Sequence, residues 1–219
     1  MRYKLAVFDM DGTVLDTLDD LADAMNAALR ETGMPERTRE EVRKFVGNGA
    51  GELIRRAAPE GADDEALSAL GEAFRARYYA HCADKTRPYD GIPGLLSALR
   101  AAGMKTAVVS NKPDKAVAKL AEDYFPRAFD IAVGEREGVR RKPAPDAVLE
   151  VMKRLGAAAE ETVYIGDSDV DCATAANAGT DFIGVCWGFR PREVLEESGA
   201  KVVCATADEL LALILGSER

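Results

Sequence analysis

The sequence predicts an α/β fold: a Rossmann-like parallel sheet flanked by helices, with a small α-helical domain inserted after the first strand. Three observations carry this prediction. Short β-rich runs alternate with helical patterns over most of the chain, one internal stretch holds helical patterns only, and polar side chains follow several of the runs. Alternating strands and helices are typical of βαβ units, which place their strands in a parallel sheet.

Six short β-rich runs predict the strands of the sheet. They span residues 4–9, 105–110, 129–133, 162–166, 181–186 and 201–204. Helical periodicity lies between them at residues 92–102, 113–123, 145–155 and 168–178, and an apolar run at residues 210–215 predicts a C-terminal helix. Gly103, Gly156 and Gly179 directly follow helical patterns, as expected of residues that end a helix in the left-handed conformation.

One stretch interrupts the alternation. Residues 17–86 contain no convincing strand, and helical patterns occupy residues 18–32, 39–46, 50–58 and 64–82. A turn-rich segment at residues 86–93 returns the chain to the sheet. The predicted organisation is an α/β core formed by residues 1–16 and 88–219, with a helical insert formed by residues 17–87.

Composition excludes several classes of protein. Of the 219 residues, 38 are Asp or Glu and 29 are Lys or Arg, so the formal net charge is −9, which disfavours binding to a nucleic-acid backbone. No apolar run approaches the ~18 residues of a membrane span. The four cysteines form no CxxC pair, which predicts reduced thiols and a cytoplasmic location. Because the chain has a single histidine, catalysis is expected to rely on carboxylates or lysines.

Acidic and polar motifs follow several predicted strands, at the sheet edge where open α/β folds bind ligands. Four such motifs occur: DMDGTVLD (residues 9–16), SNK (110–112), KP (142–143) and GDSDVD (166–171). Taken alone, each of the last three also fits an ordinary turn, a helix cap or a solvated loop. Their joint placement at one edge favours a functional site.

Four carboxylates are expected to converge at this edge: Asp9, Asp11, Asp167 and Asp171. Their mutual repulsion demands a cation. Oxygen ligands without histidine or cysteine select Mg²⁺. Lys142 and Ser110 supply a positive charge and a hydroxyl donor, which together suit a phosphoryl group.

The motifs DMDGTVLD, SN, KP and GDSDVD resemble the four motifs of the haloacid dehalogenase superfamily of phosphatases, in the same order along the chain. The helical insert resembles the C1 cap of that superfamily, so residues 17–87 are expected to form a cap domain. Within the superfamily, the segments FVGNGA (residues 45–50), LI (53–54) and SNKP (110–113) resemble the phosphoglycolate phosphatase branch.

The resemblance implies a role for each acidic residue of the motifs. Asp9 would be the nucleophile, and it needs no general base because a carboxylate is already ionised at neutral pH. Mg²⁺ would be held by Asp9, the backbone carbonyl of Asp11 and Asp167. The Asp11 side chain would protonate the leaving oxygen and then activate water. Asp171 would bind Mg²⁺ through water or orient Lys142.

The same resemblance implies a set of phosphate-binding residues in the core. Ser110 and Lys142 would hold the phosphoryl oxygens, and Asn111 would add a donor. Gly12 and Thr13, in the loop of the first motif, are also assigned to substrate binding.

The predicted activity is Mg²⁺-dependent hydrolysis of a small, acidic phosphorylated metabolite through an aspartyl-phosphate intermediate. Phosphoglycolate is the expected substrate, with Asn48 and Arg55 of the cap as candidate contacts to its carboxylate. A pyrophosphatase, a small sugar-phosphate phosphatase and a phosphomutase of the same superfamily remain open. A dehalogenase would not need Asp11, and a receiver-like signalling domain would lack both the insert and the DxDGT spacing. A monomer or homodimer is expected, without a nucleic-acid or membrane partner.

Overall fold

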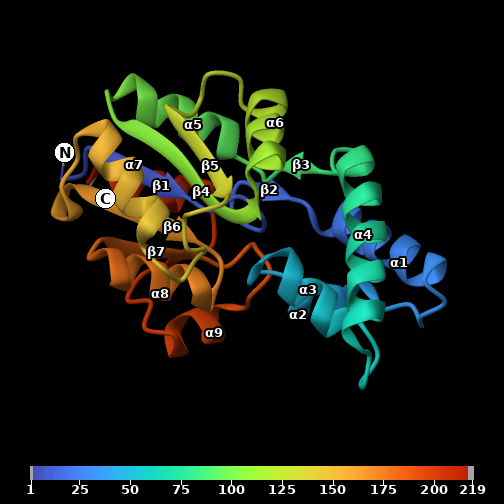
Figure 1. Ribbon diagram of the computed structural model, residues 1–219. Coiled ribbons are helices and arrows are strands. Elements are labelled where there is room, and N and C mark those ends of the chain that lie inside the picture. Colours follow the sequence, from blue (N-terminus) through green and yellow to red (C-terminus); the bar gives the residue numbers. More distant parts are fainter. Residues whose placement is uncertain (1, 217–219) are drawn as a thin grey trace. The chain divides into compact units, whose positions relative to one another are not determined.

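The computed structural model describes residues 2–216, and its internal contacts divide the chain into two compact units (Figure 1). The core unit combines the segments before residue 16 and after residue 87, and the insert unit is Asp16–Arg87. Two short strands, β2 (Leu15–Asp16) and β3 (Arg87–Pro88), form a separate two-stranded sheet where the chain passes from one unit to the other.

A six-stranded sheet with the order β5-β4-β1-β6-β7-β8 forms the centre of the core unit. Its strands are β1 (Leu5–Phe8), β4 (Lys105–Pro113), β5 (Ile131–Glu135), β6 (Thr162–Gly166), β7 (Asp181–Val185) and β8 (Val203–Cys204). All the pairings are parallel, and β1 lies between β4 and β6. The predicted parallel sheet is therefore confirmed, and the carboxyl ends of its strands share one edge.

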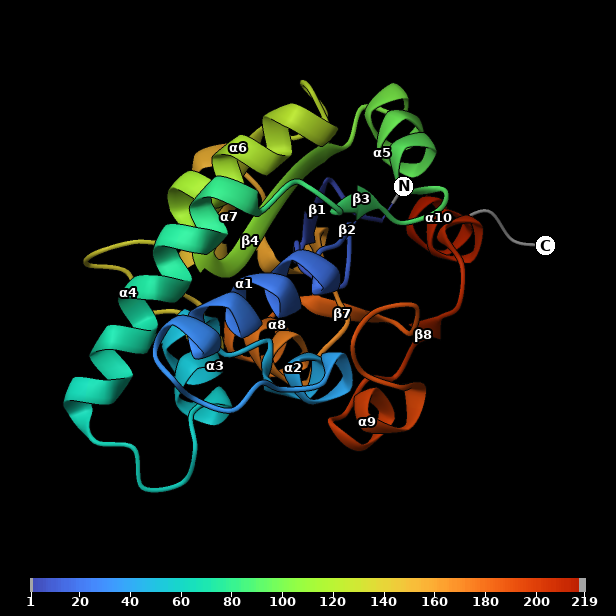
Figure 2. The same ribbon diagram turned by 90° about the vertical axis from the view of Figure 1, so that its right-hand side faces the viewer.

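Helices connect and flank the strands of this sheet. They are α5 (Ile92–Ala101), α6 (Asp114–Tyr124), α7 (Asp146–Leu155), α8 (Asp169–Ala178), α9 (Arg192–Glu197), α10 (Ala207–Leu215) and the 3-10 turn η1 (Ala159–Glu161). Figure 2 shows α5 and α10 side by side, in agreement with their contacts. Gly156 and Gly179 end α7 and α8 in the left-handed conformation, as the sequence predicts.

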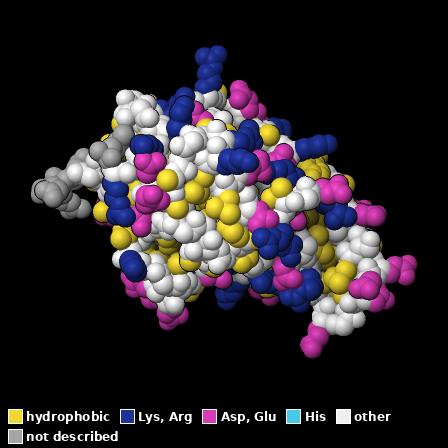
Figure 3. Space-filling model, turned by 60° about the vertical axis from the view of Figure 1, so that its left-hand side comes forward, with side chains coloured by type: hydrophobic (Ala, Val, Ile, Leu, Met, Phe, Trp, Pro, Cys, Tyr) yellow, Lys and Arg dark blue, Asp and Glu magenta, His cyan; other side chains and the backbone are white. Residues whose placement is uncertain are grey.

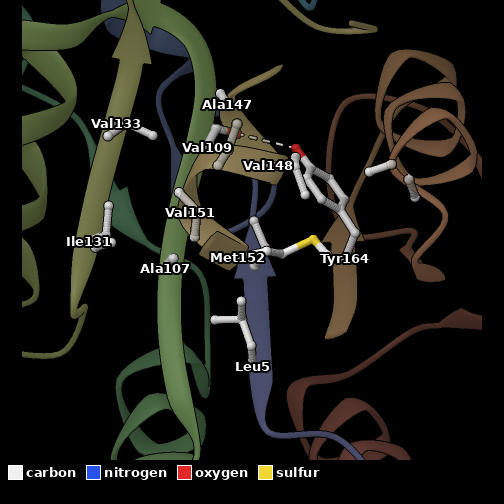
Figure 4. Packing of buried hydrophobic residues seen from close by; sticks show 13 residues of the cluster. Leu5, Ala107, Val109, Ile131, Val133, Ala147, Val148, Val151, Met152 and Tyr164 are labelled. Atoms are coloured by element: carbon white, nitrogen blue, oxygen red, sulfur yellow. Dashed lines mark hydrogen bonds between the residues drawn. The ribbon is translucent and has the colours of Figure 1, made fainter. Parts of the chain in front are cut away.

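Apolar side chains from the strands meet α7 in a buried cluster (Figure 4). The strands contribute Leu5, Val7, Ala107, Val109, Ile131 and Val133, and α7 contributes Ala147, Val148, Val151 and Met152. The α7 positions recur at helical spacing, so one stripe of the helix covers the sheet. Tyr164 of β6 lies in the same cluster, and its hydroxyl donates a hydrogen bond of 3.2 Å to the Val109 carbonyl.

The insert unit consists of four helices, which confirms the predicted helical insertion. They are α1 (Leu18–Glu31), α2 (Arg39–Phe45), α3 (Gly49–Ala57) and α4 (Asp64–His81). The long helices α1 and α4 pack against each other, and α3 contacts both α2 and α4. Buried Asp20 accepts hydrogen bonds from the backbone N–H groups of Lys85 and Thr86, which fixes the returning segment against α1.

The structure differs from the sequence prediction at short elements. β2, β3, α9 and η1 have between two and six residues each, too few to show a period in the sequence. β4 also extends beyond the predicted residue 110 to Pro113, because a register shift separates Val109 from Pro113.

No helix within residues 2–216 is both long and apolar enough to cross a bilayer. On the face shown in Figure 3, acidic and basic side chains are interspersed instead of gathering into one patch of a single sign.

Candidate active site

Three buried carboxylates meet at the carboxyl edge of the sheet. Asp9 directly follows β1, Asp167 directly follows β6, and Asp171 lies in the first turn of α8. Each offers one oxygen, and these oxygens lie within 4.8 Å of one another. β1 and β6 are neighbours in the sheet, which is why side chains 158 positions apart in the sequence (167 minus 9) come together.

The loop after Asp9 shapes the environment of Asp167. Gly12 has a φ of +86°, and a Cβ at this position would overlap the Asp167 carboxylate, so the loop requires glycine. Thr13 Oγ1 donates a 2.9 Å hydrogen bond to Asp167 Oδ1, and the Phe189 N–H donates one of 2.7 Å to Oδ2. Trp187 Nε1 in turn donates to the Thr13 carbonyl at 3.0 Å. Gly12 and Thr13, which the sequence suggests as substrate contacts, are therefore placed against Asp167.

Lys142 joins two of the carboxylates. Its Nζ lies 2.8 Å from Asp9 Oδ1, 2.7 Å from Asp171 Oδ1 and 3.1 Å from the Tyr164 hydroxyl, and its side chain is 3% exposed. Burial lowers the pKa of Lys142, but the charges of Asp171 and Asp9 more than offset this effect and raise its pKa well above the ordinary value. Lys142 is thus a permanent cation within the site.

The side chain of Asn111 holds the backbone of Lys142. Asn111 Nδ2 donates to the Lys142 carbonyl at 3.0 Å, and the Lys142 N–H donates to Asn111 Oδ1 at 2.8 Å. These two bonds position the loop that carries Lys142, and the role of Asn111 as a phosphate donor stays a prediction.

Asp171 combines a structural and an electrostatic role. Ser168 and Asp171 form a capping box at the start of α8, in which Asp171 Oδ2 accepts a 2.6 Å hydrogen bond from Ser168 Oγ. Its other oxygen contacts Lys142. This contact supports the orientation of Lys142, one of the two roles that the sequence leaves open for Asp171; the other, binding of Mg²⁺ through water, stays a prediction.

Burial and mutual repulsion make the ionised form of this cluster costly. Burial raises the pKa of Asp9 to about 7, with a further rise from the charge of Asp171, even though Lys142 acts in the opposite direction. Burial likewise raises the pKa of Asp167 to about 8, and the charges of Asp171 and Asp9 add to the rise. A cation placed among these oxygens would relieve the repulsion.

The donors present fit a hard divalent cation. Asp9 Oδ1 is buried and accepts no hydrogen bond, although it forms an ion pair with Lys142. The surrounding ligand atoms are carboxylate oxygens, the type that Mg²⁺ prefers. The cluster of Asp9, Asp167 and Asp171 is therefore a candidate metal centre.

Asp11 and Ser110 of the core unit both contact Lys112. The Asp11 carboxylate forms an ion pair with Lys112, with 2.6 Å between Oδ1 and Nζ. Ser110 is 6% exposed, and its Oγ accepts a 3.3 Å hydrogen bond from the Lys112 N–H. The structure thus gives Lys112 of the SNK motif a defined place, as a buried cation paired with Asp11.

The two candidates in the insert unit have local partners of different kinds. Asn48 is the N-cap residue of α3, but its side chain makes no capping hydrogen bond. Arg55 directs Nε and Nη2 to the two carboxylate oxygens of Glu52, at 3.0 and 2.8 Å. Of the two, Asn48 has the side chain that local hydrogen bonds leave less constrained.

Sequence reasoning gave no role in the site to four of its contributors: Lys112, which lies in the SNK motif, Tyr164, Trp187 and Phe189. Trp187 and Phe189 follow the end of β7 closely, and this position at the carboxyl edge of the sheet could have indicated that they lie near the site. Tyr164 lies inside a buried strand, where an apolar pattern conceals a hydroxyl that contacts Lys142. Only the register of the sheet reveals that contact.

A family model for haloacid dehalogenase-like hydrolases matches residues 6–185, which is most of the chain. The chain therefore belongs to this family, and it is an enzyme of the phosphatase class.

Individual relatives share both sequence and fold with this chain. It is 37% identical to a phosphoglycolate phosphatase of Pseudomonas syringae pv. syringae, over 97% of this chain and 79% of the relative. It is 34% identical to an N-acetylmuramic acid 6-phosphate phosphatase of Pseudomonas aeruginosa, over 98% and 96% of the two chains. A crystal structure from Lactobacillus delbrueckii subsp. bulgaricus, whose protein carries an inferred assignment as a phosphoglycolate phosphatase, matches with a TM-score of 0.95 and 41% identity, covering 99% of this chain and 100% of the other.

Proposed function

We propose that the protein is a Mg²⁺-dependent phosphomonoesterase that works through an aspartyl-phosphate on Asp9. The observation that carries this proposal is the buried group of Asp9, Asp167 and Asp171 beside Lys142 at the end of parallel strands. The group pairs a nucleophilic carboxylate with a fixed cation. The test is phosphate release from small phosphate esters, measured with and without Mg²⁺.

In the first half of the reaction, an Asp9 oxygen attacks phosphorus while Ser110 and Lys142 bind the phosphoryl oxygens. The bond between phosphorus and the ester oxygen breaks, and Asp11 donates a proton to that oxygen. The products of this step are the free alcohol and a phosphorylated Asp9. Asp11 suits this role because its carboxyl lies two residues from the nucleophile but outside the group of three buried carboxylates.

In the second half, water attacks the phosphorus atom of phosphorylated Asp9. Asp11, now ionised, accepts a proton from this water, so inorganic phosphate leaves and both carboxyl groups return to their first state. Lys142 keeps its contacts with the phosphoryl group or with Asp171 throughout, because Asn111 fixes its backbone.

Mg²⁺ would be held by Asp9 and Asp167, with the backbone carbonyl of Asp11 as a further oxygen ligand. When bound, it would supply the positive charge that lets a phosphate dianion approach a carboxylate. Thr13 and Phe189 would orient Asp167 for this task through their hydrogen bonds.

We propose that the substrate is a phosphate ester that also carries a carboxylate. The names of two relatives support this: phosphoglycolate and N-acetylmuramic acid 6-phosphate are both acids. Phosphoglycolate phosphatases recur among the relatives at 34–37% identity, which favours phosphoglycolate. The nearly equal length of the N-acetylmuramic acid 6-phosphate phosphatase keeps the sugar phosphate as the second candidate.

A panel of esters is expected to show this preference. Phosphoglycolate should give a higher kcat/KM than an uncharged phosphate ester of similar size, because a contact to its carboxylate, for which the sequence suggests Asn48, would favour it. Asn48→Ala should reduce the advantage and leave hydrolysis of p-nitrophenyl phosphate within about threefold of wild type, since an aryl ester uses only the phosphoryl site. An equal kcat/KM for charged and uncharged esters would contradict the carboxylate preference but not the phosphatase activity.

Stability without metal should fall as pH rises. The folded-state pKa values of Asp9 and Asp167 lie above the ordinary carboxyl value of 3.8, so their ionisation disfavours the fold. The contribution of these two carboxyl groups to the stability is full below that ordinary value and is lost as pH rises through their folded-state pKa values of about 7 and 8. The gain in Tm from saturating Mg²⁺ should therefore be larger at about pH 8 than at about pH 5.5, as measured by thermal unfolding. A gain independent of pH would contradict a metal site on these two carboxylates.

We also propose a cytoplasmic location. The support is chemical: Cys82, Cys172, Cys186 and Cys204 are all free thiols, as expected for a reducing compartment. A monomer or homodimer stays a prediction, and light scattering in solution would distinguish the two.

A further inference from the structure

Lys112 is a buried cation that the proposed chemistry does not use. Its side chain is 2% exposed, and Nζ lies 2.6 Å from Asp11 Oδ1, while the Asp11 side chain is 13% exposed. A buried ammonium group is costly unless a carboxylate pairs with it. The core unit thus holds two buried lysines with different partners, since Lys142 pairs with Asp9 and Asp171.

The backbone of β4 places Lys112 at this position. Between the pairs Val109–Val133 and Pro113–Glu135, β4 advances by four residues (109 to 113) while β5 advances by two (133 to 135). Such an irregularity redirects the side chains at the end of a strand. The Lys112 N–H also donates to Ser110 Oγ.

Gly134 of β5 supports the same irregular segment. A Cβ at this position would overlap the Lys112 carbonyl and the backbone of Asp114. The Gly134 N–H also donates a 2.7 Å hydrogen bond to Asp114 Oδ1. The fold therefore fixes the main chain on both sides of Lys112, so its side chain reaches Asp11 from a rigid base.

We propose that Lys112 is a positioning residue for Asp11: by engaging Oδ1, it fixes the orientation in which the carboxyl exchanges a proton with the ester oxygen. This inference rests on the proposed function. In the step concerned, the Asp11 O–H bond breaks as a new O–H bond forms on the leaving oxygen, and that oxygen separates from phosphorus as Asp9 bonds to it. Lys112 keeps its three protons throughout.

Loss of a residue that positions the general acid should slow hydrolysis most for esters whose leaving group must be protonated. Phenolate is a strong base and leaves slowly unless it is protonated, whereas p-nitrophenolate is stable without a proton. Phenyl phosphate and p-nitrophenyl phosphate carry the same phosphoryl group and differ little in size. The ratio of their kcat/KM values therefore isolates proton donation, because kcat/KM covers the reaction only up to release of the leaving group.

The experiment compares this ratio in wild type, Lys112→Met and Lys112→Arg, with Mg²⁺ present. Lys112→Met should lower kcat/KM for phenyl phosphate by about 10- to 100-fold, the scale of a displaced catalytic group, and change that for p-nitrophenyl phosphate by less than about threefold. Lys112→Arg keeps the charge and should recover part of the loss. Lys105→Met is the matched control at the other end of β4, where the side chain is 55% exposed, and its ratio should equal that of wild type.

Two further variants complete the test. Lys112→Gln preserves a donor and most of the side-chain length, and it replaces Lys112→Met if the latter does not fold. In an Asp11→Asn background, Lys112→Met should leave the ratio unchanged, because the group that it positions is gone.

An equal fall for both esters would overturn the proposal, because Lys112 would then act on the phosphoryl group or on the fold. An unchanged ratio in folded Lys112→Met or Lys112→Gln would overturn it as well. Wild-type protein that releases phosphate neither from these two esters nor from phosphoglycolate with Mg²⁺ would contradict the proposed function itself and, with it, this inference.

Discussion

Replacing Asp9 with Asn is expected to abolish phosphate release. The amide is a poor nucleophile and offers a weaker metal ligand, so both functions proposed for Asp9 are lost together. Loss of a catalytic nucleophile lowers turnover by roughly three orders of magnitude or more. Steady-state release of phosphate at saturating Mg²⁺ measures this effect, and activity within about tenfold of wild type would rule out Asp9 as the nucleophile.

The same variant should fold normally, which separates catalysis from stability. Burial raises the pKa of Asp9 to about 7, so Asn removes a buried group that is costly to ionise, and it also removes a charge that adds to the rise in the pKa of Asp167. Lys142 retains Asp171 as a partner. At about pH 8 without metal, the Tm of Asp9→Asn should therefore be no lower than that of wild type. Asp169→Asn is the matched control: its side chain is 53% exposed beside the same cluster, and its activity should stay within about twofold of wild type.

Much of the fold was predictable because polar motifs mark the ends of strands. Asp9 follows an apolar run, and Asp167 follows another, so a parallel sheet with these runs as neighbours must bring the two carboxylates to one edge. Gly156 and Gly179, which end α7 and α8, and the lack of strand patterns in the insert were also clear signals. These features depend on local sequence, which is why the sequence alone revealed them.

The contacts that position the site were not predictable in the same way. Lys112 meets Asp11 across 101 positions, and Thr13 meets Asp167 across 154. The first depends on the register shift in β4, and no residue pattern announces that shift. Asn111 is a further example, because no residue pattern announces that its amide holds the Lys142 backbone.

Removal of Mg²⁺ by EDTA is expected to stop the reaction, and added Mg²⁺ should restore it. Three buried carboxylates face one lysine at the site, so a phosphate dianion that approaches Asp9 meets net negative charge. Without the cation, we expect turnover to fall by at least about 100-fold, the scale of losing a main electrostatic contribution to a transition state. Phosphate release before and after chelation measures this. Full activity after exhaustive chelation would refute the metal requirement.

After removal of Mg²⁺, Ca²⁺ is expected to occupy the metal site but to support phosphate release poorly. Ca²⁺ accepts six to eight oxygen ligands at longer distances, roughly 2.3–2.6 Å against 2.0–2.1 Å for Mg²⁺, so it can occupy a carboxylate cluster without holding Asp9 in line with phosphorus. Both ions should therefore raise the Tm of the wild type, and neither should raise that of Asp167→Asn as much, because the variant lacks a charged ligand. An equal gain in Tm for Asp167→Asn would place the metal elsewhere. Turnover with Ca²⁺ equal to that with Mg²⁺ would show that the position of Asp9 does not depend on the size of the ion.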